Sequence, residues 1–248
     1  MTKPVCIIAA RAGSKRLPGK NKIDFNGQPI ITYPIRAAKA AGIFSHIIVS
    51  TDDDEIRAIA DAEGVWGWHR PDGLAGDQVE ETDVYRDILE RLQPDQIGPD
   101  FCAIYPTAAF ITAQDIVSAR GTMIHAGADV CMGVTGFDIH PYRTLIPDSE
   151  GFLYRRWEDL NESPSRLWPA AFASNGTLYW FKTEPFRKNA TYFPAKLVGY
   201  ETFAIDIDTP ADLARAREQI SGPSRSCLPG NDFIGKMNEE DDKLHGRG

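Results

Sequence analysis

The sequence has no long hydrophobic run and few cysteines. None of its apolar runs approaches the about 18 residues of a membrane span, and the amino-terminal residues lack the apolar core of a signal peptide. The four cysteines include no CxxC pair: Cys6, Cys102 and Cys131 lie in apolar runs, and Cys227 lies in a polar, Gly-rich stretch. We therefore expect reduced, packed thiols in a cytoplasmic protein.

Positive charge is also in short supply. The chain has 27 Lys and Arg against 35 Asp and Glu, which gives a formal net charge of −8. A pI near 5.2 argues against a nucleic-acid or membrane surface. Basic residues are nevertheless concentrated just after the first apolar run, at Arg11, Lys15, Arg16, Lys20 and Lys22. This local exception points to a small anion as the partner of the cluster.

Short β-branched runs alternate with stretches of helical periodicity. Expected strands occupy 6–10, 46–51, 65–69, 101–105, 129–134, 177–182 and 203–209, and expected helices occupy 31–41, 53–63, 84–92, 113–126 and 210–220. Most of these strands are continuously apolar, as is typical of strands buried on both faces. The pattern predicts an α/β fold, with a three-layer, mostly parallel, Rossmann-like sheet.

Two stretches depart from this alternation. Residues from about 138 to 175 are rich in Pro, Arg, Trp and Tyr without a sustained period. We expect them to form an excursion from a domain spanning 1–220, and to pair with a second subunit. Residues 221–248 are polar and Gly-rich, and we predict a disordered tail there.

The opening stretch, VCIIAARAGSKRLPGKN, reads as a strand followed by a loop rich in Gly and Lys, a geometry that holds phosphates. A P-loop is excluded, because five residues separate Gly13 from Gly19 and Asn21 stands where Ser or Thr should hold magnesium. No GxGxxG occurs either. A solvated basic loop is the alternative, but two like charges at ~4 Å repel by about 1 kcal/mol even in water. A nucleoside triphosphate would relieve that repulsion.

A second candidate site is the stretch FAIDIDT, residues 203–209. In a strand, residues two apart point to the same side, which would aim the carboxylates of Asp206 and Asp208 into one place. Magnesium accepts one or two carboxylates together with phosphate oxygens, so the pair predicts a Mg²⁺ site. The alternative is a helix cap next to a surface charge. Beside it, Thr209 is expected to cap the last helix, with Pro210 in its first position.

Several motifs together resemble the cytidylyltransferases that activate nonulosonic (sialic-acid-like) sugars. They cover residues from about 5 to 220 and read ARAGSKRLPGKN, IIVSTDDDEI, HRPDGLAGD, IYPTAAF, HPYRTL, SNGTLYW and DIDTPADL. The resemblance implies a nucleotidyltransferase reaction in which CTP and a nine-carbon 2-keto acid sugar give a CMP-sugar and pyrophosphate. It also implies Mg²⁺ as cofactor and a homodimer, with no nucleic-acid or membrane partner.

The same resemblance implies roles for residues at the nucleotide. Arg11 and Lys20 match the ligands of the triphosphate and would stabilise the departing pyrophosphate, with Lys15 on the same turn. Asn21 completes that motif. Arg70 matches an arginine beside the cytidine, and Asp77 belongs to the same loop.

Further matches concern the metal and the sugar. Asp206 and Asp208 match the metal aspartates, and Asp208 joins Arg11 and Lys20 as a catalytic residue. Asn175 and Arg143 match sugar-site positions, Arg143 with help from the neighbouring subunit's excursion. Tyr105 stands where sialic-acid synthetases carry a glutamine of the sugar pocket.

The sugar itself stays open at this stage. PYR, IYPTA and TLYW resemble the pseudaminic acid branch, whereas SNG stands where that branch often reads DAG. CMP-N-acetylneuraminate and CMP-legionaminate synthetases are therefore alternatives. A sugar-1-phosphate nucleotidyltransferase and a non-catalytic nucleotide-binding protein are more distant ones.

Aromatic residues in the second half of the chain admit two interpretations. Tyr142, Trp157, Trp168 and Trp180 could stack against a sugar, but aromatic residues at this density more often fill a core or a subunit interface. No histidine in the matched loops is an obvious general base. His140 lies nearest to a sugar-site motif.

Overall fold

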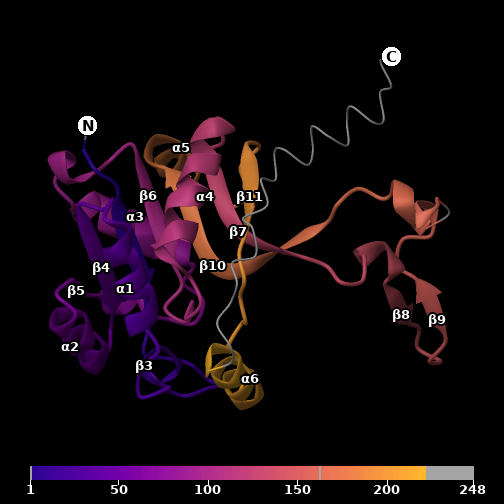
Figure 1. Cartoon of the computed structure of the whole chain (residues 1–248), viewed down its shortest axis with the longest axis horizontal. Helices are drawn as coiled ribbons and strands as arrows, with labels where there is room; N and C mark the ends of the chain where they lie inside the picture. Colours follow the sequence, from indigo (N-terminus) through magenta and orange to yellow (C-terminus); the bar gives the residue numbers. More distant parts are fainter. Residues whose placement is uncertain (1, 162, 222–248) are drawn as a thin grey trace.

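A seven-stranded sheet forms the centre of the molecule, in the order β11-β7-β10-β6-β1-β4-β5 (Figure 1). The computed structural model describes residues 2–161 and 163–221, so the tail predicted for 221–248 lies outside the described residues from 222 onward. The strands are β1 Val5–Ala9, β2 Asp24–Phe25, β3 Gln28–Pro29, β4 His46–Thr51, β5 Trp66–His69, β6 Asp100–Ile104, β7 Val130–Gly136, β8 Leu145–Pro147, β9 Leu153–Arg155, β10 Phe172–Lys182 and β11 Leu197–Glu201. The helices are α1 Thr32–Ala41, α2 Asp54–Ala62, α3 Glu81–Arg91, α4 Ala113–His125, α5 Thr183–Asn189 and α6 Pro210–Ser221.

The sheet is mostly parallel and covered on both faces. Only β10 runs antiparallel to its neighbours, β6 and β7. Helices α1, α2 and α4 bury their apolar sides on one face, and α3 and α5 bury theirs on the other. All five residues of β6 are buried, which explains the apolar run after Asp100, whose carboxylate pairs with Arg120. The predicted three-layer α/β fold is confirmed.

The carboxyl-terminal part of the sheet differs from the prediction. The expected strand at 203–209 is wrong: β11 lies earlier, at Leu197–Glu201, and 202–208 form neither helix nor strand. After the amide of Thr202 donates to the Val134 carbonyl, the chain leaves the sheet. Ile207 is then buried in a separate apolar cluster with Leu17 and Phe25, which holds this segment beside the opening loop. Helix α5 was also not predicted.

The last helix begins as the sequence indicates. The amide of Asp212 donates to the Thr209 hydroxyl, and the Asp212 carboxylate accepts from the Thr209 amide, so the two residues form a reciprocal cap. The cap fixes where α6 starts and thereby fixes the chain just after Asp208.

Residues 137–161 and 163–171 form an arm that projects from the sheet (Figure 1). Strands β7 and β10 pair as far as Gly136 and Phe172, so β10 begins inside the excursion expected for 138–175. The arm carries the β8–β9 hairpin and many exposed apolar side chains: Phe137, Ile139, Leu145, Phe152, Leu153, Tyr154, Trp157, Leu160 and Leu167.

The four aromatic residues singled out in the sequence do not form one box. Trp180 is fully buried in the main core, where its indole N–H donates to the Ile116 carbonyl. Tyr142, Trp157 and Trp168 pack together in the arm. Of the described helices, none is both long and apolar enough to cross a membrane.

Candidate active site

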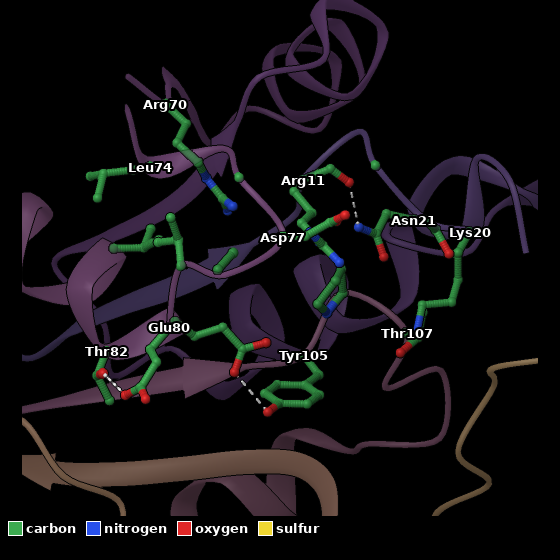
Figure 2. A pocket seen from close by; sticks show the side chains of 18 of the residues that line it. Arg11, Lys20, Asn21, Arg70, Leu74, Asp77, Glu80, Thr82, Tyr105 and Thr107 are labelled. Atoms are coloured by element: carbon green, nitrogen blue, oxygen red, sulfur yellow. Dashed lines mark hydrogen bonds and ion pairs between the residues drawn. The ribbon is translucent and has the colours of Figure 1, made fainter. Parts of the chain in front are cut away.

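A cleft of about 850 Å³ opens at the carboxyl end of β1 (Figure 2). Strand β1 lies between β6 and β4, so the chain order of the strands reverses there. Ligands of open α/β sheets bind at such a reversal. The cleft is lined by most of the site residues predicted from the sequence: Arg11, Lys15, Lys20, Asn21, Arg70, Asp77, Tyr105 and Asp208.

Basic residues of the opening loop meet the carboxylate predicted near the other end of the chain. Lys20 Nζ lies 2.9 Å from Asp208 Oδ1, and Arg16 Nη2 lies 2.6 Å from Asp208 Oδ2. The hydrogen bond from Lys20 holds the pKa of Asp208 below its ordinary value, with Arg16 adding to the effect. The predicted convergence of the two ends on one cleft is confirmed by these contacts.

The opening loop is irregular but fixed at several points. The Ala12 amide donates to Asp52 Oδ1, and Gly19 takes a left-handed conformation, with φ of 67°, before the short 3-10 turn η1, Lys20–Lys22. Asn21 is buried. Its Nδ2 donates to the Arg11 carbonyl, and its Oδ1 has no hydrogen-bond partner among the described residues. A buried acceptor in this state is ready for a donor from a ligand.

Two further cations of the loop are bridged by one acid. Asp77 lies 2.6 Å from Arg11 and 2.5 Å from Lys15, and these two cations, Lys15 first, lower its pKa. By contrast, Lys22 points away from the cleft and pairs with Asp53 and Glu55. Asp77 thus neutralises the positive charges of Arg11 and Lys15, which are predicted to bind the triphosphate.

Arg70 is a buried cation on another wall of the cleft (Figure 2). Its Nη2 donates to the Ser50 carbonyl at 2.8 Å, and burial lowers its pKa. Among residues 2–161 and 163–221, no carboxylate forms an ion pair with it. A buried guanidinium has five donors and needs further acceptors, which a nucleobase carbonyl and ring nitrogen can supply.

Asp206 lies beside the cleft rather than in its main lining. It lines a small hollow that shares Thr107 with the cleft. Desolvation and the nearby Asp208 charge raise its pKa, and no described residue forms an ion pair with it. No cluster of three or more metal-ligating side chains occurs in the described part of the chain. Two neighbouring carboxylates, one without a counter-ion, suit Mg²⁺, which takes one or two carboxylates and completes its shell with phosphates and water.

The three predicted sugar residues lie in different places. Tyr105 lines the cleft, where its hydroxyl donates to Glu81 at 2.8 Å. The Asn175 amide is used structurally: it donates to Thr202 Oγ1 at 2.7 Å and accepts from Thr177, so it ties β10 to the segment leading to Asp206. Arg143 is exposed in the arm, 5.8 Å from the centre of the Trp168 ring.

The sequence analysis missed several lining residues. Glu81 and Thr82 open α3, and Tyr192 and Phe193 lie on the loop between α5 and β11. Glu81 and Thr82 could have been found from the sequence, because they follow shortly after the HRPDGLAGD motif. The Tyr192 loop gave no such signal, since only the fold brings it to the cleft.

The fold and the cleft define a nucleotidyltransferase. Residues 5–119 match the family model described as cytidylyltransferase. The pseudaminic acid cytidylyltransferase of Campylobacter jejuni is 31% identical over 87% of this chain and 95% of its own length. The CMP-N,N'-diacetyllegionaminic acid synthase of Legionella pneumophila is 31% identical over 85% of this chain and 93% of its own length.

A solved structure of CMP:2-keto-3-deoxy-manno-octonic acid synthetase complexed with CTP shares the fold. Its TM-score is 0.66 at 17% identity, covering 89% of this chain and 99% of that one. The chain belongs to the cytidylyltransferase family whose members activate nonulosonic acids.

Proposed function

We propose that this protein transfers the cytidylyl group of CTP to a nonulosonic acid, with pseudaminic acid as the first candidate, and releases pyrophosphate. The observation that carries the proposal is the contact of Lys20 with Asp208 in a cleft at the carboxyl end of β1. This contact places the basic opening loop and the carboxylate proposed to bind Mg²⁺ in the same cleft. The relatives named for pseudaminic acid and for diacetyllegionaminic acid are both 31% identical to this chain. The choice of pseudaminic acid as first candidate therefore rests on the PYR, IYPTA and TLYW motifs.

The cleft residues would divide the nucleotide between them. Arg11, Lys15 and Lys20 bind the triphosphate, and Arg70 donates to the cytosine. Asp208 and Asp206 would hold Mg²⁺, which when bound supplies positive charge to the phosphate oxygens. Because Lys20, Arg70 and Asp208 are already held by hydrogen bonds, catalysis rests on positioning and electrostatics.

In the reaction, the anomeric hydroxyl of the sugar attacks the α-phosphorus of CTP and gives up its proton to a water molecule. The bond from the α-phosphorus to the bridging oxygen of pyrophosphate breaks, and Lys20 and Arg11 stabilise the charge that develops on that leaving group. His140 is not a base within this chain's own cleft, since its ring lies in the arm and contacts the Pro169 carbonyl.

The test is an assay of pyrophosphate release. The protein is incubated with CTP, Mg²⁺ and, separately, a sugar 1-phosphate and pseudaminic, legionaminic, N-acetylneuraminic and 3-deoxy-octulosonic acids. We expect the fastest release with pseudaminic acid. Release with another acid would rename the sugar, release with a sugar phosphate alone would favour a sugar-1-phosphate nucleotidyltransferase, and CTP binding without any release would leave a nucleotide-binding protein.

Asp77 competes with the triphosphate for its cations, and this gives a prediction. Asp77→Asn removes the two exposed ion pairs that the nucleotide must displace, so CTP should bind about two- to fivefold more tightly. Titration calorimetry with CTP measures the change, and Asp72→Asn in the same loop is the control. Weaker binding by Asp77→Asn would show instead that Asp77 supports the nucleotide.

We also propose that the arm forms a homodimer and that Arg143 acts on the partner's sugar site. Its support is the apolar surface of the arm, where Ile139 is 71% exposed, Phe152 69% and Leu153 64%. Monomeric proteins rarely expose so much contiguous apolar surface. Arg143 lies on the same arm and outside this chain's cleft.

Shortening the arm should produce a monomer. Since β7 and β10 pair up to Gly136 and Phe172, an Asn-Gly turn can replace 137–171 and close the hairpin. In analytical ultracentrifugation the intact chain should sediment at twice 27.5 kDa and the shortened chain near its monomer mass. An intact chain that sediments as a monomer would refute the dimer.

A further inference from the structure

Glu80 and Glu81 are acidic residues of the cleft that the proposed reaction does not use, and of the two only Glu81 is held by phenol hydroxyls, whereas Glu80 accepts from Thr82. Glu81 is the first residue of α3 and lines the cleft, half-buried. No ion pair to it occurs within 2–161 and 163–221. A cleft that binds a triphosphate gains nothing from an extra negative charge, so this carboxylate requires another explanation.

Two phenols hold one oxygen of this carboxylate. The Tyr105 hydroxyl donates to Glu81 Oε2 at 2.8 Å, and the Tyr192 hydroxyl donates to the same oxygen at 3.1 Å. The Tyr192 hydroxyl also lies 3.3 Å from that of Tyr85, which is fully enclosed in the core. Burial is the main cause that raises the pKa of Tyr105, and the charge of Glu81 adds to it. The Tyr105 hydroxyl therefore keeps its proton at neutral pH and remains a hydrogen-bond donor.

The other oxygen, Oε1, accepts no hydrogen bond from a described residue. A carboxylate oxygen has two lone pairs and can only accept, so its partner must be a donor. The phenols fix the direction of the group, which leaves Oε1 as an oriented acceptor in a space that binds substrate. This arrangement selects for N–H or O–H groups and disfavours carbonyls, carboxylates and phosphates.

We propose that Glu81 is a specificity-determining residue whose Oε1 accepts a hydrogen bond from an N–H group of the acylamino sugar. The assignment rests on the proposed function, in which Arg70 takes the cytosine. Glu81 is bonded to Tyr105, the residue that the motif match places at the sugar pocket, whereas Arg70 is held by the Ser50 carbonyl on another wall of the cleft (Figure 2). The cytosine amine is the other N–H donor among the substrates.

The substitution Glu81→Gln tests this with little change of shape. The amide oxygen can still accept from both phenols, while the amide NH₂ then replaces Oε1 and turns an acceptor into a donor. A purely structural role for Glu81 therefore predicts little effect. Glu90→Gln is the matched control, because it makes the same change on the same helix at an exposed position outside the cleft.

The experiment compares wild type, Glu81→Gln and Glu90→Gln with pseudaminic acid, which carries acylamino groups, and with 3-deoxy-octulosonic acid, which has none. CTP binding is measured separately by calorimetry, which also verifies folding. For Glu81→Gln we expect kcat/KM for pseudaminic acid to fall about 10- to 100-fold, as a lost charge-assisted hydrogen bond implies. CTP affinity should stay within about twofold, and selectivity against the nitrogen-free acid should fall.

Each other outcome overturns something definite. Unchanged sugar kinetics in Glu81→Gln would overturn the assignment. Weakened CTP binding together with improved UTP binding would also overturn it, and would give the acceptor to the cytosine amine instead. No turnover of any of the four acids of the panel by the wild type would overturn the proposed function and this assignment together, whereas wild-type turnover with an unaffected variant overturns the assignment alone.

Discussion

Replacing Asp208 by Asn should lower kcat by about 100-fold or more, the order lost when one main electrostatic contact of a transition state is removed. Asp208 is the carboxylate at which Lys20, Arg16 and the proposed metal site meet. The amide keeps the shape of the side chain but removes its charge. The rate of pyrophosphate release at saturating CTP and sugar measures the effect.

The control for this variant is Asp87→Asn on α3. Asp87 also pairs with an arginine, Arg91, and its side chain is 26% exposed against 25% for Asp208. Since a surface ion pair contributes about 0–1 kcal/mol to stability, the control should fold and turn over normally. If Asp208→Asn kept near-normal turnover, Asp208 would have no place in the metal site.

The inner strands β1 and β6 could be predicted because they are buried on both faces. Strand β4 spans 46–51 as expected, and β1, β5 and β6 agree to within a residue at each end. The apolar runs within β1, β4 and β6 leave few other structures open, whereas β5 is an edge strand with no buried residue. In β11, the other edge strand, buried residues alternate with less buried ones, so its sequence lacks a continuous apolar run.

The site residues that lie close together in the sequence could be predicted. Those that only the fold brings together could not. The loop cations lie within a few residues of one another, so their charge density was visible. Asp206 and Asp208 were found through an expected strand that does not exist. Their proximity comes from the burial of Ile207 between them, which anchors an irregular segment. The contact of Tyr192 with Glu81 joins residues 111 positions apart in the sequence, so no local sequence pattern predicts it.

Asn175 shows a different limit. A motif match placed it at the sugar, whereas in the structure its donors and acceptor are engaged by Thr202 and Thr177. Adding a Cβ to Gly133 would place it 2.9 Å from the Asn175 amide oxygen and 2.2 Å from Thr177 Oγ1. The side of the amide that faces Gly133 is therefore filled by protein, while Asn175 also lines the small hollow beside Asp206. Its role toward the sugar remains a proposal, and its contacts point to positioning of the Asp206 segment.

Replacing Lys20 by Ala should raise the KM for CTP about 10- to 100-fold, because a charge-assisted contact with the triphosphate is lost. Lys20 has the geometry for this role: its Nζ contacts Asp208 at 2.9 Å and its side chain is 22% exposed. Lys22 offers a close control in the same turn, 28% exposed but paired with Asp53 and Glu55 outside the cleft. Lys22→Ala should leave the KM for CTP unchanged.

Combining Lys20→Ala with Asp208→Asn distinguishes a shared site from two separate ones. Residues in direct contact are not additive, so the double variant should lose less activity than the product of the two single losses. The cycle is measured as kcat/KM for CTP at a fixed sugar concentration. Strictly multiplicative losses would mean that the lysine and the aspartate act on different steps, and the contact between them would then carry no weight in the proposed reaction.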